Sequence, residues 1–267
     1  MDPSSDRQTA LVTGASSGIG FELAKQFAEH GFELIVVAED DAIVDAAREL
    51  QGIGGDVQAV RADLATDDGL AELYRYIDAA GRPLDAVALN AGIGAGGAFA
   101  TDTDLRDELK LIDLNVRSTV HVAKYVLREM VARGEGRVLF TSSIASTMPG
   151  SFQAVYNASK SFVQSFGLAL REELKDSGVT ITLLMPGPTE TEFFERADML
   201  DTKVGQADKD DPADVARDGF EALMAGRERV ESASLSTKLQ GRGSRVLPDK
   251  AKAKMHRQMA EPKSADR

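Results

Sequence analysis

Thr13-Gly14-Ala15-Ser16-Ser17-Gly18-Ile19-Gly20 follows the apolar run Ala10–Thr13 and leads into Phe21–His30, a segment with helical spacing. Glycine has no side chain, so the backbone can approach a ligand closely at the three glycines of this stretch. Free N–H groups at the start of the following helix attract an anion. The spacing is G-x-x-x-G-x-G, which differs from the general G-x-G-x-x-G fingerprint. The stretch predicts a pyrophosphate-binding turn; the alternative is a tight strand–helix turn without a ligand.

Short apolar runs alternate with segments of helical spacing through most of the chain. This pattern indicates βαβ units and a parallel sheet covered on both faces. Right-handed crossovers then give a doubly wound, Rossmann-type α/β fold. We expect one catalytic domain over residues 1–230 and a partly helical C-terminal extension over residues 231–267. The expected strands are Ala10–Thr13, Leu34–Ala38, Val57–Ala62, Asp85–Leu89, Val138–Thr141 and Val179–Met185.

Composition excludes several classes of protein. Hydrophobic residues make up 43% of the 267 residues and charged residues 28%, with no cysteine, so a disulfide framework and a thiolate metal site are excluded. The three histidines are dispersed and show no ligand spacing, so no metal is expected. A net charge of −12 argues against nucleic-acid binding. A polar start and the absence of an apolar run near the ~18 residues of a membrane span lead us to expect a cytoplasmic protein without a membrane partner.

An acidic cluster, Glu39-Asp40-Asp41, follows the second expected strand. Glu39 lies about 20 residues beyond the glycines, where a carboxylate accepts hydrogen bonds from an adenosine ribose and repels a 2′-phosphate. No Arg or Lys stands between Glu29 and Arg48 to receive that phosphate. The cluster therefore favours NAD over NADP; the alternative is a solvated helix-cap cluster.

Two further segments carry groups that can move a proton. Ser143 follows the expected strand Val138–Thr141 by two residues. Tyr156 and Lys160 are four residues apart and therefore lie on one face of an expected helix. An ammonium beside a tyrosine favours the phenolate, so Tyr156 can exchange a proton with an alcohol or carbonyl oxygen. Ser143 would hold the same oxygen by a hydrogen bond. Alone, Y-x-x-x-K is common on helix surfaces; its combination with the glycine turn is far more specific.

Six motifs occur in order and at characteristic spacings: Thr13–Gly20, Asn90-Ala91-Gly92, Leu114-Asn115-Val116, Ser143, Tyr156/Lys160 and Pro186-Gly187. Through them the chain closely resembles the short-chain dehydrogenase/reductase family over roughly residues 8–230. The resemblance implies an Asn115–Ser143–Tyr156–Lys160 tetrad, in which the asparagine holds a water that relays protons from the lysine. The spacing to the tyrosine selects Ser143 over Ser142.

Carried over position by position, the resemblance also implies a cofactor site. Asp63 would contact the adenine, and Thr189 or Thr191 the carboxamide. The Ala38–Asp41 stretch departs from the lone Asp or lone Arg of many relatives, which leaves NADP open. The expected cofactor-binding residues are Gly14, Ser16, Ser17, Gly18, Ile19, Gly20, Glu39, Asp63, Leu64, Asn90, Ala91, Gly92, Tyr156, Lys160, Pro186, Gly187, Thr189 and Thr191.

The expected activity is hydride transfer between a nicotinamide cofactor and a small-molecule alcohol or ketone. Apolar or small residues at Ile93–Ala98, Met148–Phe152 and Phe193–Leu200 suit a hydrophobic substrate, although the phenylalanines of the last stretch could equally pack a lid. The alternative is a catalytically silent nucleotide sensor or scaffold of the same fold, which gains nothing from an intact tetrad. Sugar-nucleotide epimerases are a third class, disfavoured by the glycine spacing.

Two expectations concern assembly and the C-terminus. Apolar stripes over Leu105–Arg133 and Gln153–Lys175, with the family resemblance, predict a homodimer or homotetramer; packing within one subunit is the alternative. Residues 238–267 carry nine Lys or Arg and three Asp or Glu, a net +6, which leaves −18 for residues 1–237. We predict an amphipathic helix over Asp249–Ala260 that docks its methionines on protein near the lid; the alternative is a frayed terminus.

Overall fold

Seven parallel strands form one sheet in the computed structural model, which describes residues 7–232 and 247–265. Their order is β3-β2-β1-β4-β5-β6-β7, so the chain winds outward from β1 in one direction and from β4 in the other. Every neighbouring pair is parallel, as expected of a doubly wound sheet. The strands are β1 Thr9–Thr13, β2 Glu33–Ala38, β3 Val57–Arg61, β4 Ala86–Leu89, β5 Gly136–Thr141, β6 Val179–Pro186 and β7 Arg229–Ser232.

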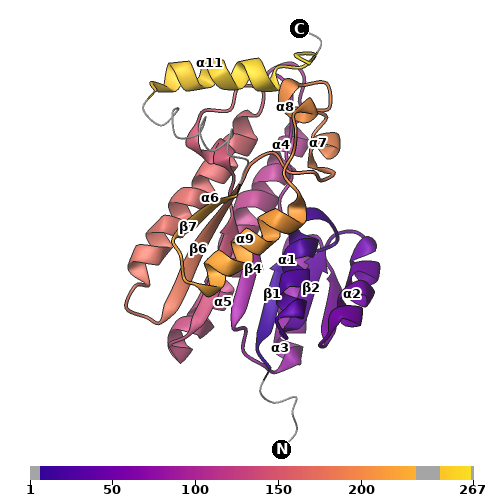
Figure 1. The fold of residues 1–267 in the computed structure, drawn as a ribbon, viewed down its shortest axis with the longest axis vertical. Helices are drawn as coiled ribbons and strands as arrows, with labels where there is room; N and C mark the ends of the chain where they lie inside the picture. Colours follow the sequence, from indigo (N-terminus) through magenta and orange to yellow (C-terminus); the bar gives the residue numbers. More distant parts are fainter. Residues whose placement is uncertain (1–6, 233–246, 266–267) are drawn as a thin grey trace, which may run out of the picture.

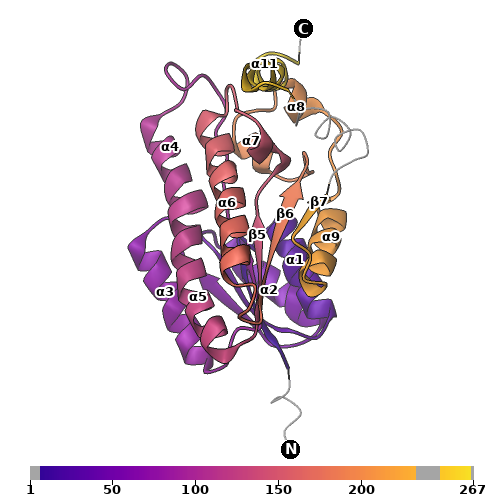
Figure 2. The ribbon, with the colours of Figure 1, turned by 90° about the vertical axis from the view of Figure 1, so that its left-hand side faces the viewer.

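Helices cover both faces of the sheet, as Figures 1 and 2 show. One face carries α1 Gly18–Glu29, α2 Ala42–Ile53 and α9 Pro212–Met224. The other face carries α3 Asp67–Ala80, α5 Thr119–Arg133 and α6 Ala154–Glu173, and α4 Leu105–Ile112 joins α5 through a π-helical segment, η2 Asp113–Ser118. Three short elements lie at the end where the strands finish: α7 Phe193–Arg196, α8 Lys203–Gln206 and α11 Asp249–Ala260.

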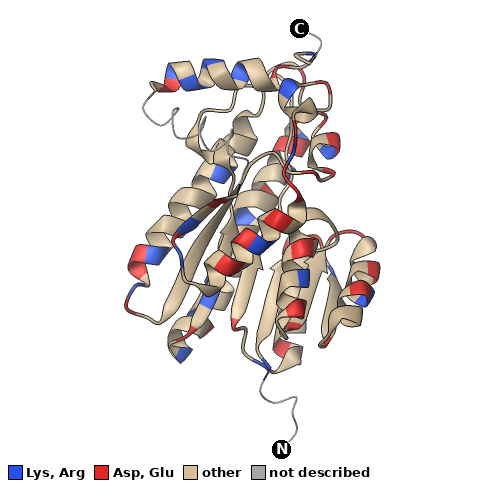
Figure 3. Cartoon of the chain, in the orientation of Figure 1, with Lys and Arg blue, Asp and Glu red and all other residues tan. Residues whose placement is uncertain are grey.

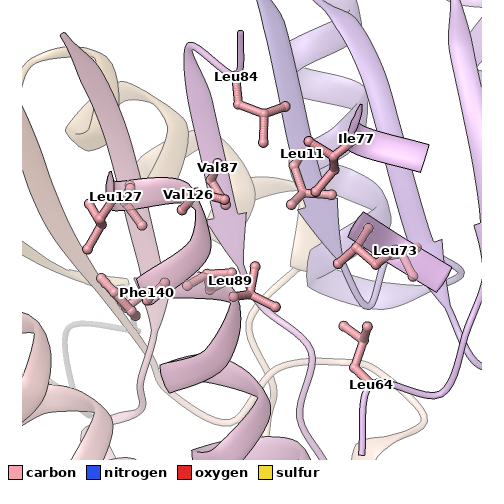
Figure 4. Close-up of a cluster of buried hydrophobic side chains, with 14 of the residues drawn as sticks. Leu11, Leu64, Leu73, Ile77, Leu84, Val87, Leu89, Val126, Leu127 and Phe140 are labelled. Atoms are coloured by element: carbon pink, nitrogen blue, oxygen red, sulfur yellow. The ribbon is translucent and has the colours of Figure 1, made fainter. Parts of the chain in front are cut away.

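Alternation along the strands sends neighbouring side chains into two separate cores. Leu11 packs toward α3 and α5, whereas Val12 packs toward α1 and α9. Figure 4 shows the first of these cores, where Leu73 and Ile77 of α3 face the sheet residues Leu11 and Val87. Because both faces of the sheet are covered, every residue of β1 is buried, and the three between its terminal threonines are apolar. Each fully buried leucine contributes about 1.5–3 kcal/mol.

The sheet topology fixes the place of the site. The strand order reverses between β1 and β4, and in open α/β sheets ligands bind beyond the carboxyl ends of the strands at this point. The turn after β1 and the loop after β4 meet there. Figure 2 shows β6 pointing toward the same end of the molecule, where α7 and α11 lie.

The six expected strands and the fold class are confirmed. The seventh strand, Arg229–Ser232, escaped the sequence analysis because its only large apolar residue is Val230, flanked by charged residues. This strand crosses the expected boundary at residue 230. Residues 1–6 lie outside the described residues, as do residues 233–246 and 266–267 of the expected C-terminal extension. Within the described part of the chain, no helix is long and apolar enough to cross a membrane.

Candidate active site

The turn between β1 and α1 leaves room for an anion. Gly14 and Gly18 have φ of +66° and +56°, which favour glycine, and a Cβ on Gly14 would lie 2.8 Å from Cα of Ala91. A Cβ on Gly20 would lie 1.9 Å from the carbonyl oxygen of Gly14. Ser17 precedes α1 and forms no side-chain cap, so the first N–H groups of the helix keep their capacity to bind a ligand. This bare cradle fits a dinucleotide pyrophosphate.

Thr13 and Asn90 brace the turn from behind. The Thr13 hydroxyl accepts hydrogen bonds from the backbone N–H groups of Asn90 and Ala91, each at 2.9 Å. The Asn90 amide donates to the Thr13 carbonyl at 3.2 Å. Asn90 therefore joins β4 to the glycine turn, a structural role that the sequence analysis did not anticipate.

The acidic cluster after β2 is partly neutralised by cations from distant parts of the chain. Lys110 of α4 lies 3.0 Å from the Glu39 carboxylate, and that hydrogen bond raises the pKa of Lys110 above 10.5. Arg61 of β3 lies 2.7 Å from Asp41 and also donates to the Glu39 carbonyl. The Ser16 hydroxyl donates to Asp40 at 3.0 Å. Three carboxylates and two cations leave a net −1, where the sequence alone suggested −3.

Tyr156 stands in the first turns of α6, buried to 9% exposure. Burial raises the pKa of Tyr156 to about 12, and a hydrogen bond from Ser143 opposes that rise. The Lys160 ammonium lies 5.9 Å from the centre of the Tyr156 ring. In the protein without a cofactor, burial thus outweighs the nearby ammonium, and Tyr156 is protonated at neutral pH.

Ser142 and Ser143, adjacent in sequence, make different contacts. The Ser142 hydroxyl donates to the Lys160 carbonyl at 2.9 Å and ties β5 to α6. The Ser143 hydroxyl accepts from the Ala145 backbone N–H at 3.1 Å and also reaches Tyr156. Ser142 is thus occupied with the backbone, whereas Ser143 faces the tyrosine.

Lys160 is buried and lies beside Asn115. Its ammonium donates to the Thr141 carbonyl at 3.0 Å, and burial lowers its pKa to about 8. A Cβ on Gly92 would lie 3.1 Å from both the Lys160 ammonium and the Asn115 amide oxygen. Only a glycine leaves these two groups the space between them.

The π-helical segment positions Asn115. Its amide exchanges two hydrogen bonds of 2.9 Å with the Ile93 backbone and donates to Ser159 at 3.1 Å. Asn115 thereby fixes the loop after β4 against α6. Thr119 donates its hydroxyl to the Asn115 carbonyl, which stabilises the irregular helix.

Phe193 of α7 closes one side of the site. Its ring centre lies 5.1 Å from that of Tyr156, and a Cβ on Gly94 would lie 2.4 Å from the Phe193 ring. The Gly96 N–H donates to the Ala197 carbonyl at 2.9 Å, and the Gly97 N–H to the Phe152 carbonyl at 2.9 Å. We call residues 193–206 the lid; it is hydrogen-bonded to the loop after β4, and that loop is hydrogen-bonded in turn to the loop before α6.

These elements enclose one cavity of about 820 Å³. Of the expected site residues, Asn115 alone does not line it, because this side chain lies behind Gly92 and Ile93. The cavity walls also include Lys203 of the lid, Lys209 just beyond it and His256 of α11, which were not expected there. Met255 and Met259 of α11, which were predicted to dock near the lid, line the cavity as well. The described residues contain no cluster of three or more His, Asp or Glu suited to a metal.

A Rossmann-type dinucleotide-binding domain is the class that this fold and glycine turn define. A family model described as short chain dehydrogenase matches residues 8–199. An uncharacterized short-chain type dehydrogenase/reductase of Sinorhizobium fredii is 35% identical over 197 residues, 74% of this chain and 76% of that protein. Oxidoreductase UcpA of Salmonella typhimurium is 34% identical over 224 residues, 82% and 81% of the two chains. The chain belongs to the short-chain dehydrogenase/reductase family, a family of oxidoreductases.

Solved structures share the fold. A family member from Burkholderia phymatum in complex with NAD has a TM-score of 0.81 at 24% identity, covering 89% of this chain and 92% of that chain. A short-chain dehydrogenase from Sphingobium yanoikuyae in complex with NADPH has a TM-score of 0.77 at 26% identity, covering 90% and 96%. The two neighbours carry different nicotinamide cofactors on one architecture.

Proposed function

We propose that the protein is a nicotinamide-dependent dehydrogenase or reductase that interconverts an alcohol and a carbonyl compound, with Tyr156 as the proton donor and acceptor. The observation that carries the proposal is the meeting of Tyr156, Ser143 and Lys160 in the cavity that contains the glycine turn. The bound cofactor would supply or accept the hydride. The glycine turn would hold its pyrophosphate, and Asp63 and Leu64 would lie against its adenine.

Tyr156 is suited to give its proton to a carbonyl oxygen. The burial that raises its pKa to about 12 keeps the hydroxyl protonated before reaction. As the proton leaves, the Lys160 ammonium stabilises the developing phenolate, and the Ser143 hydroxyl binds the substrate oxygen. Ser143 and Tyr156 thus define where the substrate oxygen sits, and the same groups run the reaction in the alcohol-oxidising direction.

NAD(H) is the cofactor we propose over NADP(H). The support is the residual negative charge of the acidic cluster, of which Glu39 and Asp40 line the cavity. The neighbouring cations, Lys110 and Arg61, are engaged by Glu39 and Asp41 and are not free for a 2′-phosphate.

The Tyr156→Phe variant tests this function. We expect kcat for ketone reduction to fall about 10²–10⁴-fold, because a positioned proton donor contributes that much. Binding of the reduced cofactor, followed by its fluorescence, stays within about twofold because the hydroxyl alone is removed. Tyr76→Phe makes the same change on α3, outside the cavity, and serves as the control. If Tyr156→Phe reduces the ketone at the wild-type rate, the proposal is wrong. If the wild-type protein binds the cofactor but turns over no alcohol or ketone, a catalytically silent sensor is favoured.

Self-association is also proposed, as a homodimer or homotetramer. The α4 residues Leu105 and Leu109 are 67% and 49% exposed, and Phe162 of the adjacent α6 is 41% exposed. Exposed large apolar side chains on two neighbouring helices are typical of a contact surface. Light scattering at micromolar concentration measures the mass, and a particle of 28.5 kDa contradicts association.

A further inference from the structure

Helix α11 lies across the end of the molecule (Figures 1 and 2), and its residues Met255, His256 and Met259 line the cavity. At one wall it is held by Ser151, in the loop between β5 and α6. The Ser151 hydroxyl donates to the Ala253 carbonyl at 3.0 Å, and the Ser151 carbonyl lies 2.9 Å from Nδ1 of His256. The ring of Phe152 lies 5.4 Å from the Arg257 guanidinium. The helix is therefore tied directly to the segment that precedes Tyr156.

At the other wall α11 is held by the lid. Ala260 is 1% exposed and packs with Phe194, Ala197 and Met199. Just beyond the helix, the Ser264 hydroxyl accepts from the Lys203 N–H at 3.0 Å, and the Asp201 carboxylate accepts from the Lys263 N–H at 2.9 Å. The lid and α11 thus form one apolar cluster over the substrate end of the cavity.

The buried face of α11 differs from the predicted one by one residue. The predicted helix bounds, Asp249–Ala260, are confirmed, but Met255 and Met259 remain 36% and 40% exposed while His256 is 7% exposed. The hydrogen bond between His256 and the Ser151 carbonyl accounts for this difference, because it turns His256 toward the protein. The methionines are therefore only partly buried, and they line the cavity. Flexible thioether side chains adapt to apolar ligands of irregular shape.

Two ion pairs of α11 lie within the helix or directly next to it. Lys252 pairs with Asp249 at 3.6 Å and Arg257 with Glu261 at 2.8 Å, so these lysine and arginine side chains find partners within or next to the helix itself. Figure 3 shows acidic residues on α1, α2 and α9 and also on the lid beside α11. The contacts that hold the helix are the hydrogen bonds from Ser151 and the apolar packing on the lid.

His256 brings a polar group to this apolar end. A carbonyl oxygen only accepts, so Nδ1 carries the proton toward Ser151, and in the neutral ring Nε2 is left as an acceptor. Burial lowers the pKa of His256 below 6.5, which keeps the ring neutral at pH 7. Within the described residues, Nε2 has no hydrogen-bond partner. Because His256 lines the cavity, an accessible acceptor there can receive a hydrogen bond from a ligand that carries a donor.

We propose that α11 forms the distal half of the substrate site, where Met255 and Met259 cover the apolar body of the substrate and Nε2 of His256 accepts a hydrogen bond from a hydroxyl at its far end. The substrate class is an elongated apolar ketone, or the corresponding alcohol, with a hydroxyl group remote from the reacting carbon. This assignment rests on the proposed function, because the proximal half is the Tyr156 site.

The test compares methyl ketones of increasing chain length, each with and without a terminal hydroxyl, as substrates of the full chain with the reduced cofactor. We expect one chain length at which the hydroxylated ketone has a kcat/KM up to about tenfold higher, because its hydroxyl gains a hydrogen bond to Nε2. His256→Asn keeps a side-chain donor at the position of Nδ1 for Ser151 and removes Nε2. In that variant the preference falls to one or below. Cyclopentanone, which has no chain to reach α11, reports the activity of the proximal half in the wild type.

Two controls make the outcome decisive. His256→Gln places an acceptor near the former Nε2 and restores part of the preference. Lys254→Asn changes the exposed face of the same helix and leaves the preference intact. Equal kcat/KM for all pairs in the wild type, or a preference that survives in His256→Asn, overturns the assignment to His256.

Calorimetry separates this failure from failure of the proposed function. If the hydroxylated ketone binds the cofactor-loaded protein, with affinity lost in His256→Asn but no turnover by the wild type, the activity is wrong and the distal site stands. If cyclopentanone is reduced but no pair is discriminated, the activity stands and the distal site is wrong. If no ketone binds or is reduced, both are wrong.

Discussion

Backbone atoms form the wall at one end of the cavity, and side chains form it at the other. At the glycine turn, the Gly14 N–H donates to the Val37 carbonyl at 2.8 Å, and Gly20 packs directly against the Gly14 carbonyl. At the lid and α11, flexible side chains such as Phe193 and Met255 form the walls. A backbone wall tolerates no added atom, whereas a side-chain wall can move. The first end therefore fixes one ligand shape, and the second can change its ligand without disturbing the fold.

Gly20→Ala should break the backbone end. Its Cβ would lie 1.9 Å from the Gly14 carbonyl oxygen, so the turn has to open. We expect cofactor affinity to fall about 100-fold, or roughly 2.7 kcal/mol. The same overlap lowers the free energy of unfolding by about 1–3 kcal/mol. Cofactor fluorescence titration and thermal denaturation measure the two effects.

Gly94→Ala is the matched change at the side-chain end. Here the added Cβ would lie 2.4 Å from the Phe193 ring, which can rotate away. We expect cofactor affinity within about twofold of the wild type and a KM for ketones raised about threefold to tenfold, because displaced walls misplace the substrate. If Gly94→Ala weakened the cofactor as much as Gly20→Ala, the contrast between the two ends would be wrong.

The same contrast explains what the sequence could predict. The glycine turn, the parallel strands and the fold class follow from local patterns: short continuous apolar runs between helical segments, and glycines at the turn after the first strand. Ser143, Tyr156 and Lys160 meet because parallel strands and the start of α6 share one edge of the sheet. The place of His256 in the cavity wall, in contrast, depends on the contact between α11 and Ser151. These two segments are over a hundred residues apart in the sequence, so no local pattern encodes the contact.

Lys160 lies where the two ends meet, and it should control the pH profile. Burial lowers its pKa to about 8, so the ammonium predominates below pH 8 and is lost above it. Because the ammonium stabilises the developing phenolate of Tyr156, we expect kcat/KM for ketone reduction to be flat below pH 8. Above it, the value falls about tenfold for each further pH unit.

Lys160→Arg provides the control for this assignment. A guanidinium stays protonated throughout the range, so the fall near pH 8 should disappear, although the absolute rate is lower because the group has a different shape. A wild-type profile that stays flat to pH 10 would show that Lys160 keeps its proton in the cofactor complex.

Charge around the cofactor ribose was predicted only in part. The cluster Glu39-Asp40-Asp41 is local and was read directly, but its cations come from β3 and α4, 20 to 71 residues away. Such pairs follow from tertiary packing, since Lys110 reaches Glu39 only when α4 folds beside the carboxyl end of β2. A test of the predicted preference for NAD must therefore change the Glu39 carboxylate and the Lys110 ammonium separately and together.

Glu39→Gln should shift cofactor choice by the smallest amount. Removing one carboxylate frees Lys110 to meet a 2′-phosphate, so we expect the ratio of NADP(H) to NAD(H) affinity to rise about threefold to tenfold, since partly exposed charges contribute little each. Adding Lys110→Ala in that variant should reverse the gain, and raising the salt concentration should shrink it. Asp45→Asn removes an exposed carboxylate outside the cavity and serves as the control. A wild-type preference for NADP(H), or a ratio unchanged by Glu39→Gln, would mean that Lys110 and Arg61, rather than the carboxylates, decide which dinucleotide binds.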